Sequence, residues 1–182
     1  MTLIETGFKG LLLIEPRVFE DERGYFMETY NAGLFQDAGI DHKWVQDNQS
    51  KSTYGVIRGL HYQLNPKAQA KLVRVLEGKI LDVAVDLRKN SETFGQWFAT
   101  ELSADNKKQL LIPRGFAHGF SVLTKNATVF YKCDNLYAPE MERSIDIFDE
   151  KLKIDWKIDS LKTVISEKDR HNSSFLNAEH NF

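Results

Sequence analysis

Residues 80–87 alternate between two kinds of side chain with a period of two. One face of this segment is apolar and comprises Leu81, Val83, Val85 and Leu87. The other face comprises Asp82, Ala84 and Asp86. Successive side chains of a β-strand point to opposite faces, so this alternation predicts a strand rather than a helix. A strand needs neighbours to bond its backbone, and the rest of the chain must therefore supply a sheet.

Several other short segments also have strand character. Residues 10–16 form an apolar run that ends at Pro16, and residues 71–76 lead into a predicted tight turn at residues 77–79. Residues 127–132 are rich in β-branched and aromatic side chains, which favour strands. Many short strands separated by Gly, Pro, Asn and Asp predict an all-β sandwich or barrel.

Few segments are helical in pattern. Asn31 is a candidate N-cap for a short helix that Gly39 can end. Residues 160–166 could form a second helix near the C-terminus, although their pattern is ambiguous. No internal repeat or linker divides the chain, so we expect one domain over residues 1–182.

The composition narrows the classes of function. The formal net charge of −2 gives no basic field for nucleic acid or an anionic membrane surface. No apolar run approaches the roughly 20 residues that span a bilayer. Cys133 is the single cysteine and cannot form an internal disulfide. We therefore expect a cytoplasmic protein without nucleic-acid or membrane partners.

Two histidines lie in settings that favour chemistry. His61 follows Arg58 within residues 56–63, and His118 lies within residues 112–120. Histidine serves either as a general base or as a metal ligand. A metal site needs three or four ligands, yet Gln63 occupies the position two after His61 and no third histidine is placed to join the pair. We expect no metal.

A histidine base needs further groups, and the residues alone leave their identity open. The candidate orienting carboxylates are Asp82, Asp86 and Asp169. Tyr131 is either a proton donor or an aromatic side chain of the core. The candidate phosphate contacts are Arg23, Lys71 and Lys168, although single surface cations are commonly only solvated.

The polar segment 46–52 is either a loop or a set of hydrogen-bonding groups for a base or sugar. Neither a G-x-G-x-x-G nor a Walker pattern is present. We therefore expect no nicotinamide, no other cofactor and no nucleotide hydrolysis.

A series of short strings, in a specific order and spacing, resembles one family. They are Pro16, 21–28 (DERGYFME), 46–48 (QDN), 58–63 (RGLHYQ), 69–74 (QAKLVR), 82–88 (DVAVDLR), 91–95 (SETFG), 113–120 (PRGFAHGF), 131–132 (YK) and 166–169 (SEKD). Over residues 8–170 the chain thereby resembles the dTDP-4-dehydrorhamnose 3,5-epimerases. The resemblance implies a cupin-type jelly-roll sandwich or barrel with a few short helices.

The resemblance also implies an activity. It is the 3,5-epimerisation of dTDP-4-dehydro-6-deoxy-D-glucose to dTDP-4-dehydro-L-rhamnose through an enolate, without a cofactor. His61 matches the base, Asp169 its paired carboxylate, Tyr131 the opposite proton donor and Lys71 the cation beside the enolate oxygen.

Further positions match substrate contacts of the family. They are Arg23, Phe26, Glu28, Gln46, Asn48, Arg58, His118, Glu142 and Lys168. Several of these contacts cross a homodimer interface in the family, where N-terminal strands are exchanged. The resemblance therefore implies a homodimer.

The chain departs from the family pattern at a few points. Leu136 precedes Tyr137 where two aromatic residues are common, and Trp156 is followed by lysine rather than proline. Three alternatives stay open. They are a single-carbon epimerase or 3,4-ketoisomerase acting on another nucleotide-linked 4-keto sugar, a non-catalytic cupin that binds a sugar nucleotide, and a metal-dependent oxygenase.

Overall fold

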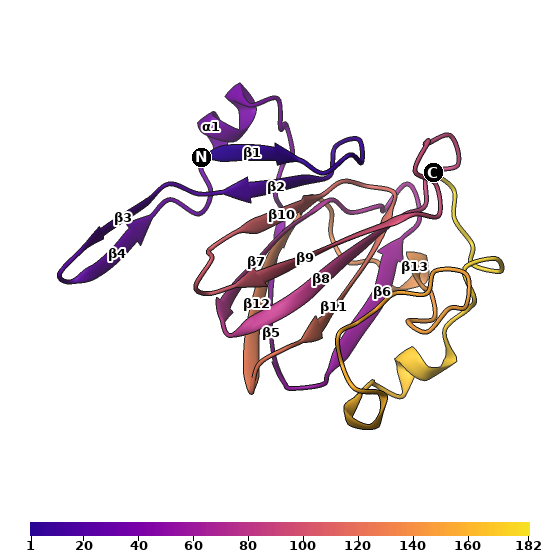
Figure 1. Cartoon of the computed structure of the whole chain (residues 1–182). Helices are drawn as coiled ribbons and strands as arrows, with labels where there is room; N and C mark the ends of the chain where they lie inside the picture. The colour runs from indigo at the N-terminus through magenta and orange to yellow at the C-terminus, as the bar shows by residue number, and fades with distance from the viewer.

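The computed structural model describes residues 1–182 as two antiparallel sheets packed face to face (Figure 1). The first sheet has the strand order β1 (Thr2–Glu5), β2 (Leu12–Glu15), β10 (Gln109–Ile112), β7 (Lys71–Glu77), β12 (Asn126–Cys133) and β5 (Gln46–Thr53). The second has the order β13 (Glu142–Ser144), β6 (Ile57–Gln63), β11 (Phe116–Val122), β8 (Lys79–Asp86) and β9 (Trp97–Ser103). The expected jelly-roll sandwich is confirmed, as are the strands predicted near residues 10–16, 71–76, 80–87 and 127–132.

The remaining two strands form a hairpin apart from both sheets. Strands β3 (Val18–Asp21) and β4 (Gly24–Met27) pair only with each other and project from the body of the molecule (Figure 1). Phe19, Tyr25 and Phe26 on this hairpin are exposed. We refer to residues 18–27 as the arm.

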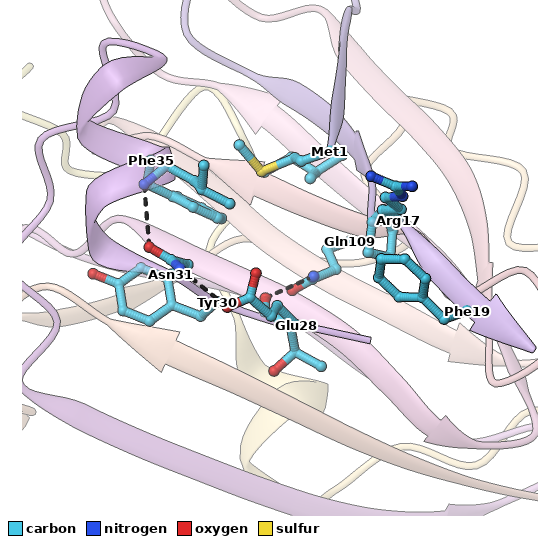
Figure 2. Close-up of a pocket in the computed structure, with 12 residues that line it drawn as sticks. Met1, Arg17, Phe19, Glu28, Tyr30, Asn31, Phe35 and Gln109 are labelled. Carbon is cyan, nitrogen blue, oxygen red and sulfur yellow. Dashed lines mark hydrogen bonds between the residues drawn. The ribbon is translucent and has the colours of Figure 1, made fainter. Parts of the chain in front are cut away.

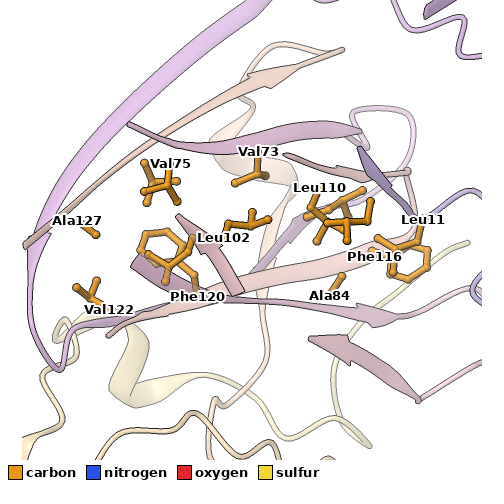
Figure 3. Close-up of a cluster of buried hydrophobic side chains, with 14 residues drawn as sticks. Leu11, Val73, Val75, Ala84, Leu102, Leu110, Phe116, Phe120, Val122 and Ala127 are labelled. Carbon is orange, nitrogen blue, oxygen red and sulfur yellow. The ribbon is translucent and has the colours of Figure 1, made fainter. Parts of the chain in front are cut away.

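An apolar core fills the space between the sheets (Figure 3). Val73 and Val75 of β7 meet Ile80 of β8 and Phe120 of β11 across this space. The tight turn at residues 77–79 carries the chain from the first sheet to the second, because β7 pairs with β10 and β12 whereas β8 pairs with β9 and β11. The turn prediction is thereby confirmed.

Strand β8 is buried on both faces. The face with Leu81, Val83 and Val85 contacts a second apolar cluster, which covers the outside of the five-stranded sheet with residues from the C-terminal part of the chain. The opposite face points between the sheets, where Asp82 and Asp86 are fully buried. The alternating side chains of β8 therefore pack into two different apolar clusters, one on each face of the five-stranded sheet.

The helical segments lie outside the sandwich. Helix α1 (Ala32–Asp37) places Phe35 on the outer face of the six-stranded sheet, and the Asn31 side chain accepts a hydrogen bond from Leu34 N as predicted. The other helical pieces are 3-10 turns: η1 (Pro139–Met141), η2 (Ser160–Lys162) and η3 (Lys168–His171). The second predicted helix over residues 160–166 is wrong beyond the single turn of η2. No helix is both long and apolar enough to cross a membrane.

The polar segment 46–52 is a strand and not a loop. It is the edge strand β5, where half-buried Gln46, Asn48 and Ser50 alternate with exposed Asp47 and Gln49. Asn48 lies opposite Tyr131 of β12, so these half-buried amides share the inner face of the sheet. The period of two is present, but both faces are polar, and this hides the strand in the sequence.

A bulge in β6 brings two functional side chains to one face. His61 pairs with His118, whereas Arg58 pairs with Phe120, so three steps on β6 match two steps on β11. Side chains three apart in a regular strand would point to opposite faces, and the extra residue of a bulge corrects this. Arg58 and His61 therefore both line the cavity between the sheets.

We predict that Gly59→Ala destabilises the protein by at least about 2 kcal/mol. Gly59 has a φ of +140°, and an added Cβ would lie 2.5 Å from the Gly119 Cα. The matched control is Gly7→Ala, since Gly7 has a φ of +85° with no atom within 4 Å of an added Cβ, and it should cost only about 1 kcal/mol. Urea unfolding of both variants measures the difference, and equal losses would contradict the close approach of β6 and β11.

Candidate active site

Two adjoining cavities open between the sheets, and His61, Lys71 and Tyr131 line both of them. The outer cavity of about 210 Å³ is also lined by Gln46, Asn48, Gln63, Gln69, Tyr137 and Glu142. The inner cavity of about 470 Å³ is also lined by Arg58, His118, Phe120, Lys168 and Asp169. The three shared residues come from both sheets and mark the point where the cavities join.

His61 is held by Asp169. The Nε2 atom of His61 lies 2.7 Å from Asp169 Oδ1, and the Asp169 side chain is 5% exposed against 30% for His61. Burial alone would raise the pKa of Asp169, but the hydrogen bonds to His61, Ser166 and Asn172 together hold that pKa below its usual value. Asp169 therefore stays ionised near neutral pH and can balance a positive charge on the imidazole.

The two other carboxylates that the sequence left open lie elsewhere. Asp86 accepts hydrogen bonds from Arg88, Ser91 and Thr93 and fixes the loop after β8. Asp82 bonds to His118 instead of His61, with 2.6 Å between Oδ1 and Nε2. The structure thus pairs each cavity histidine with a carboxylate of its own.

Lys71 and Tyr131 lie on adjacent strands of the six-stranded sheet. Lys71 is opposite Cys133, two residues from Tyr131, and its Nζ lies 5.8 Å from the centroid of the tyrosine ring. Burial lowers the pKa of Lys71, although Cys133, Asp82 and Glu142 act in the opposite direction. Burial raises the pKa of Tyr131. The phenol therefore keeps its proton at neutral pH and can donate it.

Charged and hydroxyl groups form the rim of the two cavities, with Glu142 and Tyr137 on the outer one and Arg58 and Lys168 on the inner one. Glu142 Oε2 accepts hydrogen bonds from Lys168 Nζ at 2.6 Å and from the Tyr137 hydroxyl at 2.8 Å. Arg58 Nε donates to Ser52 Oγ on the edge strand. These groups present hydrogen-bond donors and acceptors around the entrance.

Tyr137 is a rim residue that the sequence reasoning did not select. In the sequence it stands out only as the neighbour of Leu136, and the signal that could have found it is an aromatic residue five positions before the predicted contact Glu142. Leu136 itself is exposed, while its carbonyl accepts a hydrogen bond from Gln63. Leu136 does not line either cavity.

The Gln63 side chain has a structural role. Its Nε2 donates to the carbonyls of Lys67 and Leu136, and its Oε1 accepts from Ala138 N. No three side chains among the His, Cys, Asp and Glu residues are placed together so as to hold a metal ion. The Gln63 side chain thus anchors the loop that carries Tyr137.

Three predicted substrate contacts lie away from this cavity in their own chain. Arg23 at the turn of the arm pairs with Asp21, and Phe26 is 67% exposed. Glu28 lines a separate apolar cavity at the base of the arm, where its carboxylate accepts a hydrogen bond from Asn31 (Figure 2). A single chain therefore gathers His61, Lys71, Tyr131, Asp169, Gln46, Asn48, Arg58, His118, Glu142 and Lys168, but not Arg23, Phe26 or Glu28.

Known proteins resemble the chain over nearly its whole length. Residues 5–177 match a family model described as dTDP-4-dehydrorhamnose 3,5-epimerase. A protein of that name from Shigella flexneri is 49% identical over 99% of both chains. The crystal structure of the enzyme from Elizabethkingia anophelis is 54% identical, with a TM-score of 0.94 over 97% of both chains.

A third relative carries a ligand. The epimerase of Legionella pneumophila, solved in complex with dTDP-4-keto-L-rhamnose, is 46% identical with a TM-score of 0.92 and covers 97% of this chain and 93% of its own. The family match, the high identity over full length and the shared fold agree. The chain belongs to the dTDP-4-dehydrorhamnose 3,5-epimerase family.

Proposed function

We propose that this chain inverts carbons 3 and 5 of a dTDP-linked 4-keto-6-deoxy sugar, with His61 as base and Tyr131 as acid. The observation that carries the proposal is the convergence of His61, Lys71 and Tyr131 on one cavity from two facing sheets. Carbons 3 and 5 both flank the ketone, so the anion left by proton removal delocalises onto the ketone oxygen. One base beside that oxygen can serve both carbons.

Each half-reaction begins with proton removal. The C–H bond breaks, the proton passes to the ring nitrogen of His61 that does not bond Asp169, and the electron pair forms the enolate. The buried carboxylate of Asp169 stabilises the resulting imidazolium and fixes the ring. The Lys71 ammonium stabilises the negative oxygen, an effect that grows as water is excluded.

Inversion requires that the proton return from the opposite face of the sugar. Tyr131 comes from the sheet that faces β6, and its raised pKa makes it a protonated donor at neutral pH. Its phenolate takes up a proton from solvent through the open mouth of the cavity, and the His61 imidazolium releases its proton to solvent, so both groups return to their starting forms. Repetition at the second carbon completes the double epimerisation, with no net change in atoms.

The rim residues fit the rest of the substrate. Gln46, Asn48 and Tyr137 offer amides and an aromatic ring for a pyrimidine base, and the cations Arg58 and Lys168 suit a diphosphate. The ligand of the Legionella pneumophila relative supports a dTDP-sugar as the substrate of this chain.

Deuterium exchange tests the two central roles. Incubated with dTDP-4-keto-6-deoxyglucose in heavy water, the wild-type protein should incorporate deuterium at carbons 3 and 5 and form the L-rhamno product by NMR. His61→Asn should lower exchange at both carbons by about 100- to 10,000-fold. Tyr131→Phe should retain exchange and lose inversion. Full exchange in the first variant, or unchanged stereochemistry in the second, would contradict these roles.

Lys71 should set an alkaline limit on activity. Burial lowers its pKa, so kcat/KM should fall as the pH rises, beginning below the range in which a free lysine loses its charge. Lys71→Arg keeps a cation that stays charged throughout this pH range, so its profile should lack this decline while the plateau is lower by about 10- to 100-fold. An unchanged alkaline limb in the arginine variant would exclude Lys71 as its source.

We further propose a homodimer in which the arm of each chain completes the partner's site. The arm makes no sheet contact in its own chain and exposes Phe19, Tyr25 and Phe26 together with Arg23. An isolated hairpin is marginally stable in water, so these side chains need a surface to cover them. The resemblance implies that Arg23 and Phe26 contact the substrate. Neither side chain lines the cavities of its own chain.

Co-expression tests the exchange of arms. An Arg23→Ala/Phe26→Ala double variant and His61→Asn should each be nearly inactive alone. Mixed dimers would contain one site with His61 from one chain and an intact arm from the other, so random pairing should restore about a quarter of the wild-type sites. No recovery in verified mixed dimers would refute the arm exchange.

We also propose that the protein acts in the cytoplasm. The single buried thiol of Cys133 and the nucleotide-linked substrate support this location. Cell fractionation followed by detection with an antibody tests this location. Finding the protein outside the cytoplasm would contradict the proposal.

A further inference from the structure

Asp82 is a buried carboxylate to which the proposed mechanism gives no role. Its side chain is fully buried; Oδ1 bonds to His118, and Oδ2 is buried without any hydrogen-bond partner. A buried carboxylate with an unpartnered oxygen is costly, so its presence needs a reason.

The fold does not supply that reason. Asp82 lies on the inner face of β8 between Ile80 and Ala84, which both belong to the core between the sheets. It is opposite Phe120 on β11 and Thr100 on β9. An apolar residue would suit these neighbours better, and the bond to His118 is the one polar contact that Asp82 makes.

The bond to Asp82 determines the form of the His118 ring. An ionised carboxylate only accepts hydrogen bonds, so Nε2 of His118 must carry a hydrogen, and in the neutral ring Nδ1 then holds a bare lone pair. No protein group bonds to Nδ1, and the ring lines the inner cavity beside Lys71. Burial lowers the pKa of His118, and the nearby Lys71 and His61 lower it further, whereas Asp82 raises it. The ring is therefore a neutral hydrogen-bond acceptor in the lining of the cavity.

Two histidine–carboxylate pairs thus stand side by side with different properties. His61 and His118 are direct partners across β6 and β11. The His61 side chain is 30% exposed, whereas that of His118 is 6% exposed. The first is open to the cavity and to solvent, whereas the second is enclosed, and burial lowers its pKa.

We propose that Asp82 is a positioning residue for the epimerisation, which acts through His118 by fixing the tautomer that accepts a hydrogen bond from a hydroxyl of the bound sugar. This inference rests on the proposed function. A sugar anchored by that bond presents carbons 3 and 5 to His61 in a constant orientation. Loss of the acceptor on His118 should reduce the stabilisation of the transition state by more than it reduces the binding of dTDP alone.

Asp82→Asn reverses the polarity of the contact with no change of shape. The amide should direct its nitrogen at His118, because an unpartnered buried N–H is rarer than an unpartnered oxygen. Nε2 then becomes the acceptor and Nδ1 carries the hydrogen. We expect kcat/KM to fall about 10- to 100-fold, with dTDP affinity within about threefold of wild type, as measured by calorimetry.

Nitrogen NMR of the histidine rings gives a readout that needs no substrate. Wild-type His118 should be the neutral tautomer with hydrogen on Nε2, and Asp82→Asn should show hydrogen on Nδ1. Asp86→Asn is the matched control, since it changes a buried carboxylate on the same strand that bonds Arg88 instead. It should lower stability and leave the His118 signals unchanged.

Several outcomes would overturn the inference. They are a cationic or Nδ1-protonated His118 in the wild type, an Asp82→Asn tautomer shift without loss of kcat/KM, and an equal further loss when Asp82→Asn is added to His118→Gln. The wild-type spectrum decides the first even if Asp82→Asn does not fold. A wild type that exchanges no deuterium would defeat the proposed function alone, because the tautomer is measured without substrate.

Discussion

The spacing between the two sheets is the constraint on which the site depends. His61 and His118 lie on one sheet and Lys71 and Tyr131 on the other, so no strand alone can set the distance between the proposed base and the proposed acid. That distance is kept by the apolar cluster that fills the rest of the same space (Figure 3). Apolar burial contributes about 25 cal/mol per Å² and close packing resists compression, so the core acts as a rigid spacer for the cavity.

The same burial controls the charges in the cavity. It favours the neutral forms of Lys71 and Tyr131, which keeps the phenol protonated but works against the ammonium. Carboxylates offset this cost: Asp82 and Glu142 both favour the charged lysine. A dry site that needs a cation for the enolate must therefore contain anions that the reaction itself does not consume. Buried Asp82 on β8 and half-buried Glu142 on β13 both act in this way, and Asp82 does so in addition to its bond with His118.

Strands with apolar side chains on at least one face could be predicted from the sequence, and a strand that is polar on both faces could not. Residues 80–87 show the alternation clearly, although both of their faces are buried and only the neighbours of the strand reveal this. Strand β5 was missed because polar side chains occupy both of its faces. The bulge that aligns Arg58 with His61 has no signature beyond Gly59, since a glycine in a strand has several uses.

The site residues divide in a similar way. The resemblance identifies the side chains that line the cavities. The chemistry of the residues alone does not distinguish among the three carboxylates that could orient His61. Only the fold separates Asp169, which lies on η3 and holds His61 of β6, from Asp82, which lies on β8 and holds His118 of β11. Such pairings join residues up to 108 positions apart, and no local pattern encodes them.

The arm is the part of the structure that the contacts within one chain do not explain. Its strands bury no core residue, and its aromatic side chains remain in solvent while the cavity they are expected to serve lacks a cover. The proposed exchange of arms with a second copy would account for both features, because the apolar surface would then be buried and Arg23 would reach a diphosphate. The exposed hairpin and the open cavity would then have one explanation. Such an exchange would let the fold admit a large nucleotide sugar and still exclude water from it.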